Sequence, residues 1–167
     1  NQIWRMDING GNQVLLADVP GIAQYPRFEA DGETVVFRWF NEGSAPLARV
    51  SVHGGPVRGI EGLPLSISYY WASSPDGKRF AYSSTDPATS RMYVVVKTVG
   101  QEGPGIRLDI TPSRIFKWLP DGSALVFQER LLAENPLSKI FSINPDAPQP
   151  KLLYSTEPDE LIDVRFS

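Results

Sequence analysis

Apolar residues occur along this chain in short runs, and turns rich in glycine and proline separate one run from the next. Ahead of three Asp-Gly pairs, one residue lies five positions and another three positions before the aspartate, so the two share one face of a strand. These residues are Pro26 and Phe28, Trp71 and Ser73, and Phe116 and Trp118. Behind each Asp-Gly pair a second run has an aromatic residue at the same position: Phe37, Tyr82 or Phe127. The pattern predicts antiparallel strands joined by tight turns.

The pattern recurs at a fixed interval. The Asp-Gly pairs that begin at Asp31, Asp76 and Asp121 are each 45 residues apart, and glycine supplies the positive φ of a hairpin turn. A second strand pair occurs in each copy, and its strands start near Ile3, Leu47, Met92 and Ile140, at intervals of 44, 45 and 48 residues. Four strands in roughly 45 residues are typical of a β-propeller blade. A β-sandwich would not repeat four strand types in fixed order, and the period of two excludes a helical solenoid.

We therefore predict an all-β chain built from propeller blades. Three complete four-stranded blades lie near residues 25–60, 69–110 and 114–154, and a partial blade combines residues 1–16 with residues 161–167, so that residues 1–167 form one propeller domain or propeller fragment. The partial blade follows because the sequence opens on a third strand and closes on a first strand. Two interpretations stay open: a propeller with more blades, which the abrupt stop at Ser167 favours, or a four-bladed ring with a three-stranded last blade. Self-assembly of two copies to complete a ring is a further alternative.

Two stretches, Ile3–Gly11 and Ser74–Tyr82, resemble the WD-like repeats of bacterial TolB-type propellers. Similar repeats occur in propellers of bacterial signalling proteins and beside the catalytic domain of prolyl-oligopeptidase-type serine peptidases. The resemblance extends over essentially the whole chain, although Glu29-Ala30 replaces Ser-Pro in the first complete copy and Leu119 replaces the serine in the third. It implies a propeller fold, a bacterial origin and a periplasmic or otherwise extracytoplasmic location, with a cytoplasmic location left open. It does not imply one function, because the same blade serves many.

Composition and charge exclude several function classes. The formal net charge is −3 and no Lys/Arg cluster forms a basic stripe, so we expect no nucleic-acid binding. The absence of cysteine removes thiol catalysis, disulfides and cysteine-based zinc sites. No apolar run approaches the roughly 18 residues that span a bilayer, so we expect no membrane insertion.

The sequence also lacks the residue sets of a catalytic or cofactor site, and we predict neither an enzyme nor a bound cofactor or metal. A serine hydrolase usually needs histidine as its base, but the one histidine, His53, lies in a predicted turn, and no Gly-x-Ser-x-Gly motif occurs. The stretch Asp7–Asn12 is similar to the start of a calcium loop but lacks the later ligands. No glycine loop for binding phosphate is present.

One end of the predicted blades is the expected binding face. Loops that join a fourth strand to the next first strand, or a second strand to a third, emerge there, at residues 18–24, 41–45, 61–68, 85–90, 111–113, 130–138 and 155–160. Variable loops on a rigid scaffold commonly carry binding, and aromatic and arginine side chains commonly anchor interfaces. The candidate binding residues that flank these loops are Tyr25, Trp39, Tyr69, Tyr70 and Arg130. In the alternative interpretation these aromatic residues only cap the core.

Three functional hypotheses follow from the repeats and the missing catalytic residues. The leading one is a non-catalytic scaffold that binds a protein or peptide partner, as an interaction or sensor module of a larger bacterial protein. The alternative is the gating propeller of a prolyl-oligopeptidase-type serine peptidase whose catalytic domain lies outside this chain. A third is a propeller enzyme acting on sugars through carboxylates that converge from different blades, although the spacing indicates no particular pair.

Overall fold

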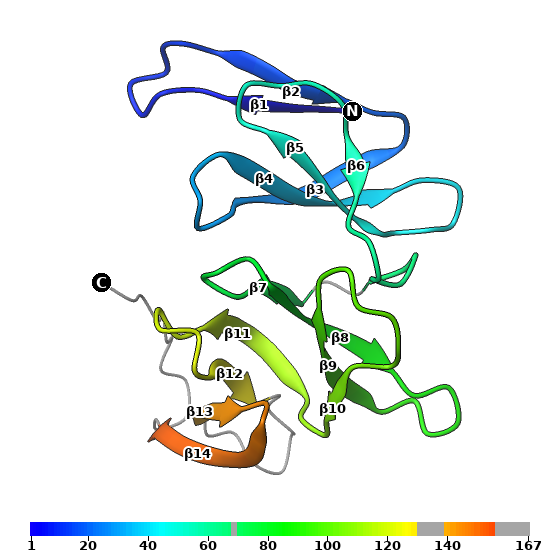
Figure 1. The fold of residues 1–167 in the computed structure, drawn as a ribbon, viewed down its shortest axis with the longest axis vertical. Coiled ribbons are helices and arrows are strands. Elements are labelled where there is room, and N and C mark those ends of the chain that lie inside the picture. Colours follow the sequence, from blue (N-terminus) through cyan, green and yellow to red (C-terminus); the bar gives the residue numbers. More distant parts are fainter. Residues whose placement is uncertain (68–69, 130–138, 156–167) are drawn as a thin grey trace. The chain divides into compact units, whose positions relative to one another are not determined.

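In the part of the chain that the structure describes, the strands form one two-stranded and three four-stranded antiparallel sheets (Figure 1). The computed structural model describes residues 1–67, 70–129 and 139–155. The two-stranded sheet holds β1 (Gln2–Arg5) and β2 (Val14–Asp18). The first complete blade holds β3 (Ile22–Phe28), β4 (Thr34–Phe40), β5 (Leu47–Ser51) and β6 (Arg58–Gly59). The second holds β7 (Trp71–Ser73), β8 (Arg79–Thr85), β9 (Met92–Thr98) and β10 (Ile106–Leu108), and the third holds β11 (Pro112–Trp118), β12 (Leu125–Glu129), β13 (Lys139–Asn144) and β14 (Ala147–Ser155).

Each four-stranded sheet is a meander, because every strand pairs with its neighbours in the sequence. This topology confirms the predicted all-β class and the predicted four-stranded blades. Within the described residues β1 pairs only with β2, and the assignment of this hairpin to the third and fourth strands of a blade stays a prediction. The first strand that the sequence predicts within residues 161–167 lies outside the described residues.

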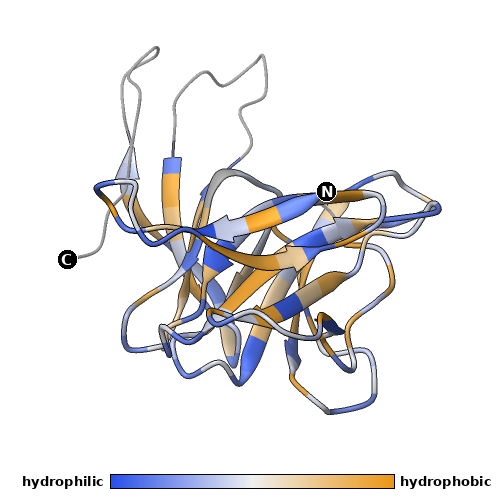
Figure 2. Cartoon of the chain, turned by 90° about the horizontal axis from the view of Figure 1, so that it is seen from above, coloured by the Kyte–Doolittle hydropathy of each residue, from blue (hydrophilic) through white to orange (hydrophobic). Residues whose placement is uncertain are grey.

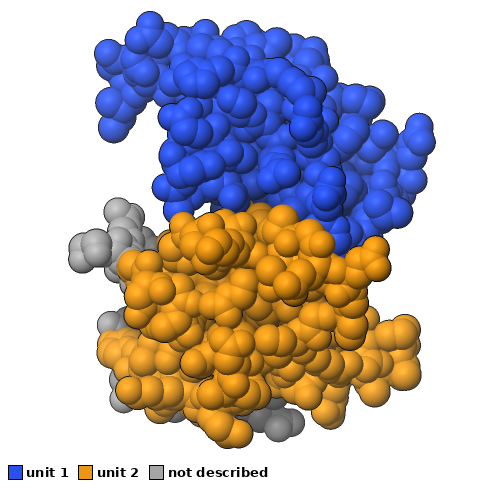
Figure 3. All heavy atoms as spheres, viewed as in Figure 1, with its two compact units in different colours: residues 1–67 blue, residues 68–167 orange. Residues whose placement is uncertain are grey.

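The chain divides into two compact units, residues 1–67 and residues 68–167 (Figure 3). In unit 1 the core lies between the β1–β2 hairpin and the first complete blade, around Ile3, Phe37 and Val50, which are at most 6% exposed. In unit 2 the core lies between the second and third blades, around Leu108 and Trp118. Apolar residues lie along the strands with polar residues among them (Figure 2). The strands β4, β8 and β12 carry runs of consecutive buried residues, whereas β14 is exposed along its whole length.

The three Asp-Gly turns share one backbone geometry. The glycines have φ of +68°, +67° and +71° at Gly32, Gly77 and Gly122, and each glycine N–H donates to the carbonyl three residues earlier, on Glu29, Ser74 and Leu119. This confirms the predicted reason for glycine at these positions. Because the turn is closed by backbone bonds, the departures from Ser-Pro in the first copy and from Ser in the third leave it unchanged.

The aspartate of each turn accepts hydrogen bonds that lower its pKa. For Asp31 the main cause is the backbone N–H of Glu33, and for Asp121 it is the backbone N–H of Ser123. For Asp76 the main cause is the hydroxyl of Ser74, followed by the N–H of Lys78. Hydrogen bonds to a carboxylate favour its charged form, so each turn is most stable with its aspartate ionised.

We expect this linkage to appear in the acid stability of the protein. A carboxyl whose pKa is lowered by folding adds stability above its unfolded pKa of about 3.9, and this stability is lost as the pH falls through the folded pKa. Asp76→Asn keeps an acceptor oxygen but binds no proton, so the free energy of unfolding should decline less steeply between roughly pH 5 and pH 2. Urea denaturation at a series of pH values measures the free energy of unfolding. If this free energy falls with pH at the same slope in the unsubstituted protein and in Asp76→Asn, the prediction is contradicted.

Candidate functional site

The structure places two of the five predicted binding residues on one strand pair of unit 1. Tyr25 lies in β3 at a bulge, where the pairing with β4 shifts between Gln24 and Arg27; it has φ of +55° and is 47% exposed. Trp39 lies in β4 opposite Ala23, half-buried against the core of unit 1. Its Nε1 donates to the carbonyl of Pro20 at 2.7 Å. Trp39 therefore has a structural role in holding the connection between β2 and β3.

The other predicted binding residues belong to unit 2. Tyr70 precedes β7 and is partly buried against the core, and its carbonyl accepts a hydrogen bond from the N–H of Ser83 at 2.8 Å. Tyr69 and Arg130 lie outside the described residues. The described members of the predicted set are thus divided between the two units, and a binding role for them stays a prediction.

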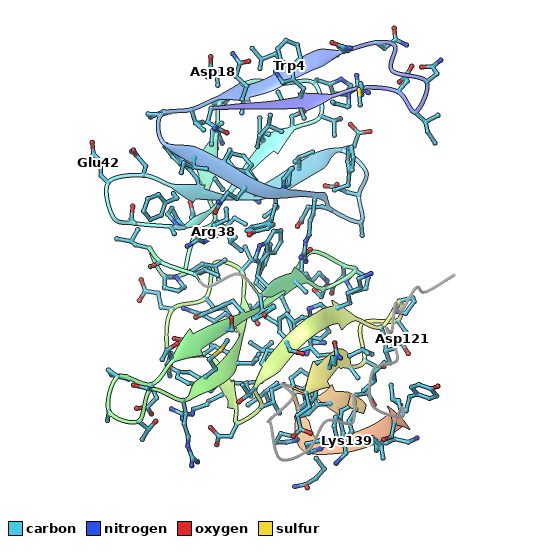
Figure 4. All side chains as sticks on the ribbon, turned by 180° about the vertical axis from the view of Figure 1, so that it is seen from behind. Trp4, Asp18, Arg38, Glu42, Asp121 and Lys139 are labelled. Atoms are coloured by element: carbon cyan, nitrogen blue, oxygen red, sulfur yellow. The ribbon has the colours of Figure 1, made fainter. Side chains whose placement is uncertain are left out.

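The loop end of unit 2 carries a cleft of about 590 Å³ between the second and third blades. It lies where β8 leads into β9, where β10 leads into β11 and where β12 ends, which is the end that the sequence predicted for binding. The opposite end of the third blade carries the turn with Asp121, and Lys139 is the first residue of β13 (Figure 4). The residues that line the cleft include Arg91, Asp109, Ile110, Phe127, Glu129 and Phe141.

The floor of the cleft is apolar and contains a stacked aromatic pair. Phe127 and Phe141 stack with ring centroids 5.6 Å apart and an angle of 19° between their planes. Phe127 is 3% exposed and Ile110 is 8% exposed, whereas Phe141 is only partly buried. Phe127 is the aromatic residue that recurs after the third Asp-Gly pair, so the blade repeat itself positions this floor.

One wall of the cleft is a short connection that its own hydrogen bonds hold in place. The Asp86 carboxylate accepts from the N–H groups of Ala88 and Thr89, at 3.0 and 3.2 Å, and these bonds lower the pKa of Asp86. Ser90 has φ of +55°, and its N–H donates to the Asp86 carbonyl at 2.8 Å. The connection therefore presents the next residue, Arg91, from a fixed backbone.

Arg107 joins this connection to the segment between β10 and β11. Its Nε donates to Asp109 at 2.8 Å, its Nη1 lies 3.5 Å from the Asp86 carboxylate, and its guanidinium stacks on the Tyr93 ring at 4.0 Å. Asp109, with a smaller contribution from Asp86, raises the pKa of Arg107. Arg107 is thus a positioning residue that fixes two edges of the cleft.

Two charged side chains at the cleft are unpaired within the described residues. The Arg91 guanidinium comes from the second blade and the Glu129 carboxylate from the end of β12 in the third blade. In the part of the chain that the structure describes, neither group takes part in a hydrogen bond or ion pair. Neither residue is among the binding residues predicted from the sequence, although each stands directly beside a predicted loop, residues 85–90 or residues 130–138.

The described residues show few other candidate sites. Within residues 1–67, 70–129 and 139–155, no group of three His, Cys, Asp or Glu side chains could hold a metal ion. None of those residues forms a helix that is long and apolar enough to cross a membrane. His53 is exposed in its hairpin turn, with Nε2 3.3 Å from the Glu33 carboxylate.

Comparison with known proteins establishes the fold alone. No protein-family model matches the sequence, and no curated protein matches it in sequence. Among solved structures, a TolB from Agrobacterium tumefaciens matches 92% of this chain and 53% of its own, with a TM-score of 0.69 and 20% identity. TolB from Acinetobacter baumannii matches 87% of this chain and 35% of its own, with a TM-score of 0.62 and 22% identity.

A third similar structure comes from a study of two prolyl endopeptidases and their inter-domain dynamics. It matches 92% of this chain and 26% of its own, with a TM-score of 0.63 and 18% identity. The chain therefore spans about half the length, or less, of these three solved proteins. The chain is structurally similar to TolB β-propellers, which confirms the resemblance that its repeats indicate.

Proposed function

We propose that this chain is a non-catalytic β-propeller scaffold that binds a protein or peptide partner at the loop end of its blades. One observation carries the proposal: the loop end of unit 2 holds a cleft with an apolar floor, a fixed wall and two charged groups, Arg91 and Glu129, that pair with none of the described residues. Binding sites on proteins commonly combine an apolar surface with a few placed polar groups. The opposite end is closed by Asp-Gly turns that satisfy their own hydrogen bonds.

A periplasmic or otherwise extracytoplasmic location, within a larger bacterial protein, belongs to the same proposal. It is supported by the structural likeness to two bacterial TolB proteins. The position of His53 supports the proposal that the scaffold is non-catalytic, because this residue lies exposed in a turn. Among the described residues, its imidazole has only the Glu33 carboxylate as an ionic partner.

The likeness to a prolyl endopeptidase structure favours one alternative, a gating propeller attached to a serine peptidase. The gene sequence around this segment tests it. A Gly-x-Ser-x-Gly motif followed by an aspartate and a histidine supports the alternative, whereas flanking sequence that encodes no such set removes it.

Because the chain contains no cysteine, a single introduced cysteine can block one chosen surface. We expect peptides selected from a random phage-displayed library to lose tenfold or more in affinity when Ser90→Cys, in the cleft wall, carries a bulky polyethylene glycol maleimide. The same label on Ser123→Cys, in the Asp-Gly turn at the other end of the third blade, should leave the affinity unchanged. Fluorescence anisotropy of the labelled peptides measures both.

The two labelled proteins form a matched pair, since both replaced serines are exposed and lie in unit 2. Equal loss of affinity from both labels, or loss only from the label at the turn, would contradict binding at the loop end. A failure to select any peptide would count against the binding function itself.

A further inference from the structure

We propose that the cleft of unit 2 binds an extended peptide in which an apolar side chain stands between one acidic and one basic residue. The apolar side chain contacts the Phe127–Phe141 floor, the acidic residue pairs with Arg91, and the basic residue pairs with Glu129. This inference rests on the proposed binding function and names the chemistry of the partner.

The floor requires the apolar side chain. Phe141 is only partly buried although it stacks on Phe127, so part of its ring faces the cleft, which Phe141 lines. Covering exposed aromatic surface is favourable at roughly 25 cal/mol per Å². Aromatic pairs also accept a third ring or a branched aliphatic side chain in favourable geometry.

The charges require one residue of each sign. Asp109, the second carboxylate at the cleft, already binds Arg107 at 2.8 Å, so it leaves Arg91 and Glu129 as the two groups without a partner among the described residues. They stand on different blades, one on the second and the other on the third. A peptide with two like charges would place one of them against a like charge, whereas a mixed peptide satisfies both.

The wall reduces the entropic cost of binding. The hydrogen bonds around Asp86 and the pairing of Arg107 with Asp86 and Asp109 hold the backbone on both sides of the cleft before a ligand arrives. A preorganised site loses less conformational freedom on binding. The cleft of about 590 Å³ is within the range for a ligand that covers a few side chains.

Three peptides test the charge pattern directly: acetyl-Asp-Leu-Phe-Leu-Lys-amide, its Lys/Lys counterpart and its Asp/Asp counterpart. At low salt the mixed peptide should bind the 167-residue chain about two- to fivefold more tightly than either counterpart, because an exposed ion pair is worth roughly 0.2–1 kcal/mol. Replacing the central phenylalanine of the mixed peptide by serine should also weaken its binding. Chemical-shift titration of the isotope-labelled chain measures affinity and location together.

Two variants should remove the preferences one at a time. Arg91→Gln should abolish the advantage over the Lys/Lys peptide and keep the advantage over the Asp/Asp peptide. Glu129→Gln should do the reverse. Each variant thus serves as the folding control for the other, and Lys78→Gln, beside the Asp-Gly turn of the second blade, should change neither preference.

Any one of four results would overturn this inference. They are equal affinity for the three peptides, preferences that survive in both variants, chemical-shift changes located away from the cleft, and no detectable binding. The proposed function fails separately. If the label on Ser90→Cys still blocks library peptides while the mixed peptide shows no preference, the binding function stands and the charge pattern is wrong.

Discussion

Replacing Trp118 with alanine is expected to destabilise the protein by about 3–5 kcal/mol. The side chain is 5% exposed and lies in the core between the second and third blades. Its Nε1 donates to the carbonyl of Ala72, 46 residues away, at 3.2 Å. The Arg79 guanidinium stacks on its ring at 4.7 Å. Alanine would remove the packing and the hydrogen bond and would leave Arg79 without its aromatic partner.

Two further variants separate these contributions. Trp118→Phe keeps an aromatic face under Arg79 but leaves the Ala72 carbonyl without its donor, which should cost about 1–3 kcal/mol. Trp4→Ala is the matched control, because Trp4 is 54% exposed and exposed substitutions usually change stability by about 0.5 kcal/mol or less. Urea denaturation followed by far-UV circular dichroism measures all three variants. A Trp118→Ala protein as stable as Trp4→Ala would show that this side chain does not link the two blades.

Replacing Gly21 with alanine is expected to destabilise the protein by about 2–5 kcal/mol, the sum of two costs. Gly21 has φ of +76°, which costs an L-residue roughly 1–2 kcal/mol. An added Cβ would also lie 2.2 Å from the carbonyl oxygen of Phe40, so the backbone would have to move, at a further cost of about 1–3 kcal/mol. The close approach exists because β3 begins directly after this glycine, where Ile22 pairs with Phe40.

Gly32→Ala is the control for the backbone conformation alone. Gly32 has a similar φ of +68°, but an added Cβ would have no heavy atom within 4 Å. We expect it to cost only the conformational part, about 1–2 kcal/mol. The indole N–H signal of Trp39 gives a second measurement, since its acceptor is the adjacent Pro20 carbonyl; it should shift in Gly21→Ala and stay in place in Gly32→Ala. Equal stability of the two variants would refute the steric argument.

Much of the blade could be predicted from the sequence because its signals are local. The Asp-Gly turns are encoded within six residues, in which the glycine takes a positive φ and the aspartate accepts neighbouring N–H groups. The aromatic residues Phe37, Tyr82 and Phe127 share one position in the repeat, and the structure buries all three. Such patterns need no knowledge of distant contacts.

The candidate site was only partly predictable. The sequence indicated the loop end of the blades as the binding face, and unit 2 carries a cleft at that end; a binding role for it stays a prediction. It could not show that the indole of Trp39 is bound by the Pro20 carbonyl, or that Arg107 pairs with Asp86 and Asp109 and leaves Arg91 unpaired among the described residues. Tyr25 was chosen for its aromatic ring, and the structure adds the bulge in β3 that holds it.

The sequence by itself determined the all-β class, the four-stranded repeat and its turns, because alternation and turn chemistry act over a few neighbouring residues. Only the tertiary structure decided which polar groups meet and which stay unpaired. Ala72 and Trp118, or Arg79 and the Gly122 carbonyl, lie 46 and 43 residues apart in the chain. Such groups meet only when blades stack face to face, and no local pattern specifies their contacts. Among the described residues, the charges of Arg91 and Glu129 are left without a partner for the same reason, because the stacking of the blades pairs the other groups around them.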